Sequence, residues 1–288
     1  MADRKYRVAV VGGAGTWGRF YARAYAEHPD CEIVALVDRA RDRRKRFAEH
    51  FGIEQVYDTV EELLVRDTPD IVSAILPVVY TYDAVMACAE AGVRVVFCEK
   101  PIAAQLSRAD ELVRVCRERG TALGCSAGRW SPPYSAEAID WIHAGHIGKL
   151  TAAAIPGGLP TEVSGGGCHQ LTLMRFLTGM EVDWVEAWTS DALPGYAAPQ
   201  PKTMFVSVVE QLVRAFDAGT EAECRGHDYR QALEIAVAMK LSAHRDHQRV
   251  ELPLKNRSLK LYPHPYRMYG GDEAGWQSIG YKGPPEVL

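Results

Sequence analysis

Near its start the chain reads RVAVVGGAGTWG (residues 7–18), and this stretch decides the fold of its N-terminal part. The apolar run at Arg7–Val11 predicts a strand, and the amphipathic run Thr16–His28 predicts the helix that follows it. Gly13, Gly15 and Gly18 therefore stand where a strand turns into a helix. This spacing is typical of turns that bind dinucleotides, because residues without a Cβ let backbone N–H groups reach a pyrophosphate at the positive end of the helix.

The sequence after this turn repeats the pattern of a strand followed by a helix. Short runs that are nearly all apolar predict four more strands, at Ile33–Val37, Ile71–Ile75, Val93–Phe97 and Ala122–Cys125. The amphipathic runs between them predict helices at Arg41–Phe51, Val60–Arg66, Tyr82–Ala91 and Arg108–Arg119. All-apolar strands are typical of parallel sheets covered on both faces. We therefore expect a doubly wound α/β Rossmann sheet over Tyr6–Ala127.

The regular alternation of predicted strands and helices ends after residue 127. Helices are predicted at Tyr134–His143, His169–Leu177, Thr203–Ala218 and Tyr229–His244. Only three short strands are predicted, at Leu150–Ile155, Trp184–Thr189 and Arg249–Leu252. Because 288 residues suit two domains, we predict a dinucleotide-binding domain over residues 1–127 and a smaller α+β domain over residues 128–288, with an abridged and mostly antiparallel sheet.

The composition limits the possible binding partners of the protein and the cellular compartment that it suits. The net charge of −4 gives no general attraction to nucleic acid or to an anionic membrane. The seven cysteines form no Cys-x-x-Cys pair, so buried thiols in a reducing compartment explain them best. The first apolar run is too short for a signal sequence or a membrane span, which favours a cytoplasmic protein. His244 and His247 have no carboxylate spaced to join them, so no metal site is predicted.

The second predicted strand ends at Val37-Asp38, and Asp38 follows Gly18 by about 20 residues, where a carboxylate receives the ribose hydroxyls of NAD. Four arginines at positions 39, 41, 43 and 44 come next and would suit the 2′-phosphate of NADP. A solvated helix face is the simpler interpretation of these arginines. The sequence therefore favours NAD, with NADP as the alternative.

A lysine follows the strand Val93–Phe97, in the run Cys98-Glu99-Lys100-Pro101. Ligands bind beside the carboxyl ends of the strands in open α/β sheets, so Lys100 is well placed to meet a substrate. An ammonium group there can hold a substrate oxygen and stabilise the charge that develops on it.

Taken together, these motifs resemble the Gfo/Idh/MocA family of NAD(P)-dependent oxidoreductases, which act mostly on sugars, polyols and related compounds. The resemblance also rests on Pro77, on the run from Ala91 to Pro101, and on the segments Gly128–Tyr134 and Gly165–Gly179. It implies that Lys100 and His169 are catalytic, and that Lys100, Trp130, His169 and Thr172 meet the substrate. The implied cofactor-binding residues are Gly13, Gly15, Thr16, Trp17, Gly18, Asp38, Arg39, Leu76, Pro77, Glu99, Lys100, Arg129 and Trp130.

The chain departs from the family's Asp-x-Gly-x-His motif. Gly165 stands four positions before His169, where many relatives have an aspartate, and Thr172 stands three positions after it in place of a second acid. A histidine without a carboxylate partner is less strongly oriented. Glu162 is near enough in sequence to replace the missing acid, although a solvated loop glutamate is the simpler interpretation.

The abridged sheet is a second departure, because the family commonly uses that sheet to form dimers and to shape the substrate pocket. Another subunit or the aromatic-rich tail would then complete the pocket. Within that tail, Tyr262, Tyr266, Tyr269 and Trp276 are numerous enough to pack onto the same subunit or onto a partner.

The functional prediction is hydride transfer between a nicotinamide cofactor and a secondary alcohol or ketone of a sugar, a polyol or a related small molecule. A homo-oligomer, either a dimer or a tetramer, is expected. Two alternatives stay open. One is a dinucleotide-binding regulator or sensor that has lost part of the catalytic set, and the other is an enzyme that uses NAD transiently for epimerisation or elimination.

Overall fold

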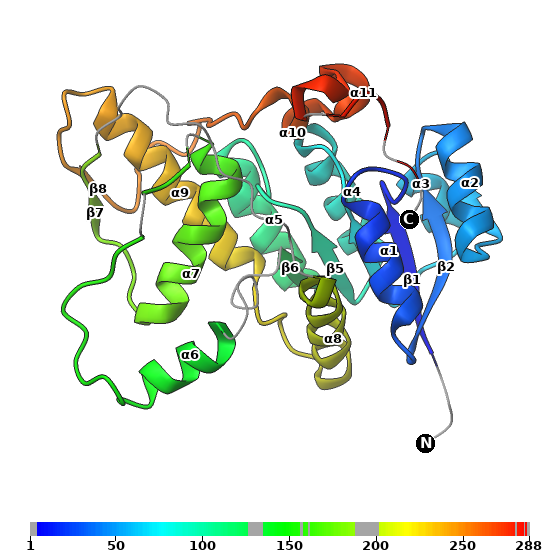
Figure 1. Ribbon diagram of the computed structural model, residues 1–288, viewed down its shortest axis with the longest axis horizontal. Coiled ribbons are helices and arrows are strands. Elements are labelled where there is room, and N and C mark those ends of the chain that lie inside the picture. Colours follow the sequence, from blue (N-terminus) through cyan, green and yellow to red (C-terminus); the bar gives the residue numbers. More distant parts are fainter. Residues whose placement is uncertain are drawn as a thin grey trace.

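Figure 1 shows the chain as a computed structural model. The structure describes residues 5–125, 135–155, 158–160, 162–187, 202–279, 281–284 and 286. The predicted boundary between residues 127 and 128 lies outside these ranges, so the division into two domains stays a prediction.

The N-terminal part is built on one parallel sheet. Its strands are β1 (Tyr6–Val11), β2 (Cys31–Val37), β3 (Gln55–Tyr57), β4 (Ile71–Ala74), β5 (Val95–Cys98) and β6 (Ala122–Cys125). They lie in the order β3-β2-β1-β4-β5-β6, and every neighbouring pair is parallel. This order, which reverses direction at β1, confirms the predicted doubly wound Rossmann sheet. The sequence prediction missed β3, a strand of three residues.

Helices cover both faces of the sheet. The α-helices of the described residues, including those that lie beside the sheet, are α1 (Gly18–Glu27), α2 (Arg41–Phe51), α3 (Val60–Arg66), α4 (Val78–Glu90), α5 (Leu106–Arg119), α6 (Ser135–His143), α7 (Cys168–Thr178), α8 (Lys202–Ala218), α9 (Gly226–Ala243), α10 (Pro265–Tyr269) and α11 (Gly271–Ala274). Residues of β1 alternate between the two faces: Val8 and Val10 enter the core with α1, α2 and α8, whereas Ala9 and Val11 enter the core with α3, α4 and α5.

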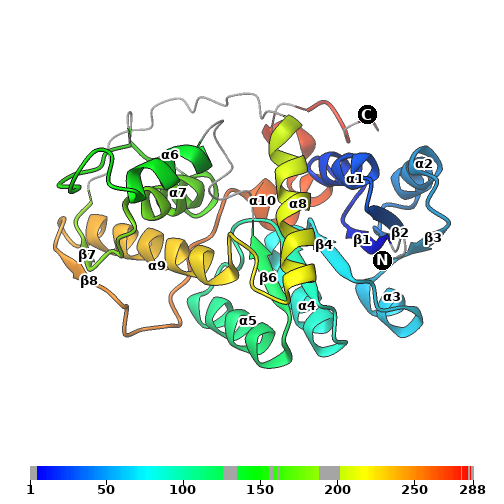
Figure 2. The same cartoon turned by 90° about the horizontal axis from the view of Figure 1, so that it is seen from below.

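The helix α8 is far from the sheet in sequence but packs directly on it. It lies against α1 and contacts β5 and β6 (Figure 2). Phe205 stacks on Phe20 of α1 with 5.1 Å between ring centroids, and Leu212 is fully buried in the same core. The sheet therefore depends on residues 202–218 to cover the face near β5 and β6.

The remaining helices of the second part form a bundle beside the β6 edge of the sheet. The long helix α9 lies between α5 and α7, and α6 packs on α7. A short antiparallel pair, β7 (Trp184–Val185) and β8 (Val250–Glu251), lies at the far end of the bundle (Figure 1). This pair confirms the predicted small antiparallel sheet. Residues 150–155 form no strand, contrary to the prediction, and residues 151–154 are exposed.

The C-terminal tail returns from this bundle to the nucleotide-binding part. After β8 the chain crosses to α10 and α11, which lie above α4 (Figure 1). A turn of 3₁₀ helix at Trp276–Ile279 follows. The tail thus packs on the same subunit, at the edge of the sheet where β1, β2 and β4 end.

None of the described helices is long and apolar enough to cross a membrane.

Candidate functional site

The glycine turn joins β1 to α1 by a close approach of backbone to backbone. A Cβ at Gly18 would lie 2.4 Å from the carbonyl oxygen of Gly12 and 2.5 Å from the Cα of Gly13. Gly12 itself has φ +73°, and a Cβ there would lie 2.2 Å from the carbonyl oxygen of Ile75. Only glycine fits both positions. The sequence analysis missed Gly12, although its place directly after the strand was a signal for the tight turn.

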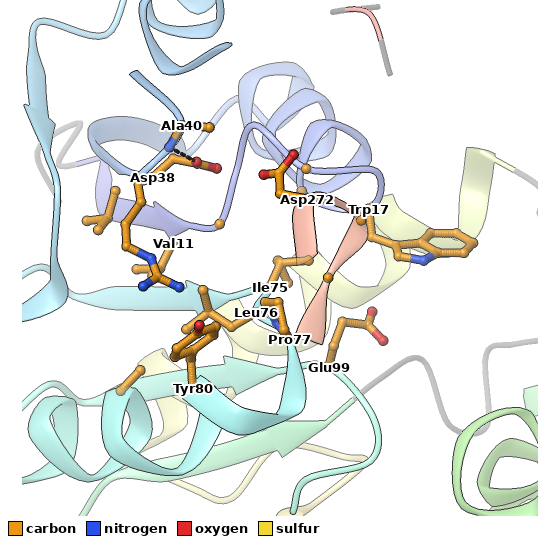
Figure 3. A pocket seen from close by; sticks show the side chains of 18 of the residues that line it. Val11, Trp17, Asp38, Ala40, Ile75, Leu76, Pro77, Tyr80, Glu99 and Asp272 are labelled. Atoms are coloured by element: carbon orange, nitrogen blue, oxygen red, sulfur yellow. Dashed lines mark hydrogen bonds between the residues drawn. The ribbon is translucent and has the colours of Figure 1, made fainter. Parts of the chain in front are cut away.

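The carboxylate of Asp38 lies beside this turn, at the end of β2. It accepts hydrogen bonds from the backbone N–H groups of Ala14, at 3.1 Å, and of Ala40, at 2.9 Å (Figure 3). Burial raises the pKa of Asp38, and the two backbone hydrogen bonds oppose that rise by stabilising the charged form. The carboxylate is therefore fixed next to the turn, where the predicted ribose site requires it.

Three of the four arginines that follow Asp38 have carboxylate partners. Arg43 forms two hydrogen bonds with Asp272 of the tail, at 3.0 and 2.6 Å. Arg41 and Arg44 both contact Asp58, at 3.3 and 2.5 Å.

The fourth arginine, Arg39, lies on an aromatic ring instead. Its guanidinium stands 4.2 Å from the ring centroid of Tyr80. Three of the four guanidinium groups that would suit a 2′-phosphate are therefore already engaged by two carboxylates.

A cavity of about 650 Å³ opens beside the turn and runs along the ends of the strands. A volume of this size is ordinary for a cofactor pocket. The predicted residues that line it are Gly15, Thr16, Trp17, Gly18, Asp38, Arg39, Leu76, Pro77, Glu99 and Lys100. Gly13 does not line the cavity; a Cβ there would meet the side chains of Leu36 and Val10, so Gly13 lets β1 pack on its neighbours. The indole of Trp17 points away from the centre of the cavity and packs near Phe205 of α8 (Figure 3).

The tail forms the opposite wall of this cavity. The hydroxyl of Tyr266 donates to the Oγ1 of Thr16 at 2.7 Å, and the hydroxyl of Tyr80 donates to Glu273 at 2.8 Å. Gly270 approaches Pro77 so closely that a Cβ would lie 2.9 Å from its ring. These tail residues were not predicted as site residues, and their only signal in the sequence was the group of aromatic residues.

The residues around this cavity fit a dinucleotide. The Cβ-free turn leaves backbone N–H groups near the start of α1, and Asp38 stands ready for ribose hydroxyls.

Lys100 lies at the other end of the cavity, after β5. Burial lowers the pKa of Lys100, and the positive charge of Arg267 lowers it further, whereas Glu99 and Glu162 oppose this. Glu99 is held in place by the hydroxyl of Tyr21, which donates to it at 2.8 Å. A lysine with a lowered pKa can exchange a proton with a substrate oxygen more readily than an ordinary surface lysine.

His169 lies in the first turn of α7, and its Nδ1 is 3.0 Å from the hydroxyl of Tyr229. Burial, together with the charges of Lys100 and Arg267, lowers the pKa of His169 to about 3. The imidazole is therefore neutral near pH 7. Neither His169 nor Thr172 lines the cavity, and Thr172 is fully buried, so the geometry gives no support to the predicted contact of either residue with substrate.

Glu162 is not a solvated loop residue. Its carboxylate accepts hydrogen bonds from Arg267, at 2.9 and 3.2 Å, and from the backbone N–H of His264, at 3.0 Å. A Cβ at Gly165 would lie 2.3 Å from the carboxyl carbon of Glu162. The carboxylate of Glu162 thus occupies the place that a side chain at position 165 would need.

Arg129 and Trp130 lie outside the described residues, so their predicted roles stay predictions. Within the described parts of the chain, no three His, Cys, Asp or Glu residues gather in a way that could hold a metal ion.

Comparison with known proteins supports an NAD-binding Rossmann fold. Residues 6–126 match the family Gfo/Idh/MocA, described as an oxidoreductase family with an NAD-binding Rossmann fold. A D-glucoside 3-dehydrogenase of Escherichia coli (strain K12) is 31% identical over 123 residues, which are 43% of this chain and 35% of that protein. A dTDP-3,4-didehydro-2,6-dideoxy-alpha-D-glucose 3-reductase of Actinomadura kijaniata is 33% identical over 159 residues, 55% of this chain and 47% of that protein. The chain thus spans at most about half of the length of these two relatives.

The fold also agrees with solved structures. An oxidoreductase from Agrobacterium radiobacter, solved in complex with NAD+, L-tartaric acid and magnesium, superposes with a TM-score of 0.74 at 18% identity, covering 86% of this chain and 98% of that one. Residues 6–126, which contain the Rossmann sheet, are thus similar to the Gfo/Idh/MocA oxidoreductase family.

Proposed function

We propose that this protein is an NAD-dependent oxidoreductase that interconverts a secondary alcohol and a ketone on a sugar, a polyol or a related small molecule. The observation that carries the proposal is the position of Lys100. It lines the same cavity as the dinucleotide turn and Asp38, and its pKa is lowered by burial. A bound nicotinamide nucleotide would supply or accept the hydride, and the chain's own residues would bind, orient and move the proton.

Lys100 is the proposed proton donor and acceptor at the reacting oxygen. As an ammonium group it donates to a ketone oxygen, and as a neutral amine it accepts the proton of an alcohol. Because His169 is neutral near pH 7 and does not line the cavity, its proposed role is to support the site through its contact with Tyr229 rather than to carry a positive charge. This differs from the catalytic role that the family resemblance implied for His169.

The substrate class rests on the relatives. The two proteins compared above are named for a D-glucoside and for a dTDP-linked deoxyglucose derivative, so a sugar-like substrate is the natural proposal for this chain. A homo-oligomer, dimer or tetramer, and a cytoplasmic location complete the proposal.

The experiment that tests this function combines binding with turnover. We expect purified protein to bind NADH, and we expect the absorbance of NADH to change in step with product formed from one member of a panel of sugars, polyols and their keto forms. NADH binding with no conversion of any compound would favour the regulator instead. Conversion of a compound without net change in NADH would favour the transient use of NAD.

The preference for NAD over NADP gives a separate prediction. We expect Asp38→Ser to reduce the ratio of NADPH to NADH dissociation constants at least about tenfold, because the variant loses a ribose acceptor and the repulsion of a 2′-phosphate. Adding Asp272→Ser should reduce the ratio further, because Arg43 then becomes available to a phosphate. Fluorescence titration with both nucleotides measures the ratio. Asp246→Ser, on the turn after α9, is the control, and an unchanged ratio in the Asp38 variant would rule out this ribose site.

A further inference from the structure

The tail and the loop before α7 meet in one ion pair near Lys100. Arg267 of α10 makes two hydrogen bonds with the carboxylate of Glu162, and the side chains of the two residues are only 21% and 25% exposed. A two-point bond of this kind fixes the direction of both side chains as well as their distance. Residues more than 100 positions apart in the chain are thereby joined at this end of the cavity.

Both partners act on the charge around Lys100. Arg267 and Lys100 line the same cavity. In the described part of the chain, the charged or titratable groups that act on Lys100 are Arg267, Glu99, Glu162 and Cys168, and Lys100 in turn acts on His169. Burial and Arg267 disfavour the ammonium form of Lys100, whereas Glu162 and Glu99 favour it. The lysine thus lies between a cation from the tail and an anion from the loop.

The backbone beside Glu162 is shaped for this carboxylate. A Cβ at Gly165 would lie 2.3 Å from Cδ and 2.3 Å from Oε2 of Glu162, so the absence of a side chain at position 165 is what makes room. The backbone N–H of His264 adds a third hydrogen bond to the carboxylate. Three donors and a fitted space hold this carboxylate against Arg267, which lines the cavity together with Lys100.

We propose that Glu162 and Arg267 are positioning residues of the reaction site, and that this pair controls how much positive charge Lys100 carries. The tail would then take part in the chemistry through Arg267, besides closing the cofactor cavity. The inference rests on the proposed role of Lys100 in turnover, but the charge state of Lys100 can be measured without any turnover.

The test compares two variants that remove opposite charges. Glu162→Gln takes away the anion that stabilises the ammonium, so we expect the pKa of Lys100 to fall by about one unit. Arg267→Gln takes away the competing cation and leaves Glu162 unmatched, so we expect the pKa of Lys100 to rise by about one unit. Competitive labelling with acetic anhydride between about pH 6 and pH 11, with mass spectrometry of the peptide that contains Lys100, measures this pKa.

Matched controls come from a second ion pair. Arg249 and Glu251 form a surface pair near β8, at the far end of the helical bundle. Arg249→Gln and Glu251→Gln make the same chemical changes and should leave the pKa of Lys100 unchanged. If the two site variants moved this pKa in the same direction, or not at all, Glu162 and Arg267 would only tether the tail and the proposal would be overturned.

Moving the carboxylate from position 162 to position 165 provides a second test. Glu162→Ala should lower the pKa of Lys100, and Glu162→Ala combined with Gly165→Asp should restore it, because position 165 points at the space left by the carboxylate. A double variant that behaves like Glu162→Ala would contradict the assigned geometry. If the charge shifts appear and no substrate is found, Glu162 and Arg267 still control the charge of Lys100, but the proposed oxidoreductase activity fails and with it their role in a reaction.

Discussion

Turnover should fall by at least about 1000-fold in the Lys100→Met variant, while the affinity for NADH stays within about twofold of the unaltered chain. Methionine keeps most of the length of the side chain but can neither donate a proton nor balance charge on the reacting oxygen. The glycine turn and Asp38 are untouched, so cofactor binding should persist. Initial rates on the identified substrate and fluorescence titration of NADH measure the two quantities.

Lys255→Met, at an exposed position after β8, is the matched control. Rates measured against pH should also separate the two directions of reaction. Reduction requires the ammonium form of Lys100, so its rate should fall as pH rises through the lowered pKa of Lys100, whereas the rate of oxidation should rise over the same interval. A Lys100→Met variant with normal turnover would remove the basis of the mechanism.

The Gly18→Ala variant should lose NADH binding, with a dissociation constant at least about 100-fold higher. The added Cβ would lie 2.4 to 2.6 Å from backbone atoms of Gly12 and Gly13, which cannot rotate away as a side chain would. The turn must therefore open, and its N–H groups leave their places near the start of α1. Titration calorimetry with NADH measures the loss, and circular dichroism shows whether the remaining helices and strands persist.

A Gly283→Ala control adds the same methyl group where nothing lies within 4 Å, and its affinity for NADH should not change. Unaltered binding in the Gly18→Ala variant would mean that the cavity holds its ligand without help from the turn.

The sequence alone predicted the Rossmann part because each element there carries its own local signal. Buried strands such as Val95–Cys98 are continuous apolar runs, and α2 and α3 have the bounds that their patterns predicted. The strand β3 was not predicted because two of its three residues are exposed and only its pairing with β2 defines it. Residues 150–155 have the composition of a strand, but a strand needs a hydrogen-bonded partner, and the described structure gives them none.

The residues of the site also fall into a group that the sequence predicted and a group that it did not. Gly18, Asp38 and Lys100 lie at the ends of predicted strands or the start of a predicted helix, so topology brought them together. Arg267 and Tyr266 reach the cavity by contacts across more than 100 and more than 200 residues, and such contacts leave no periodic trace in a sequence. Glu162 could not be assigned because its role depends on the empty space at Gly165 and on a partner in the tail.

Because the tail forms the second wall of the cavity, the order in which the chain is synthesised on the ribosome affects when the pocket forms. The turn and Asp38 leave the exit tunnel long before Tyr266, Asp272 and Trp276, which lie on the opposite wall of the same cavity. A nascent chain therefore presents an open half-site until residues 266–276 have emerged, and the pocket gains its second wall only then. Premature termination before residue 266 would leave the Rossmann sheet with its glycine turn, but with a groove in place of an enclosed pocket.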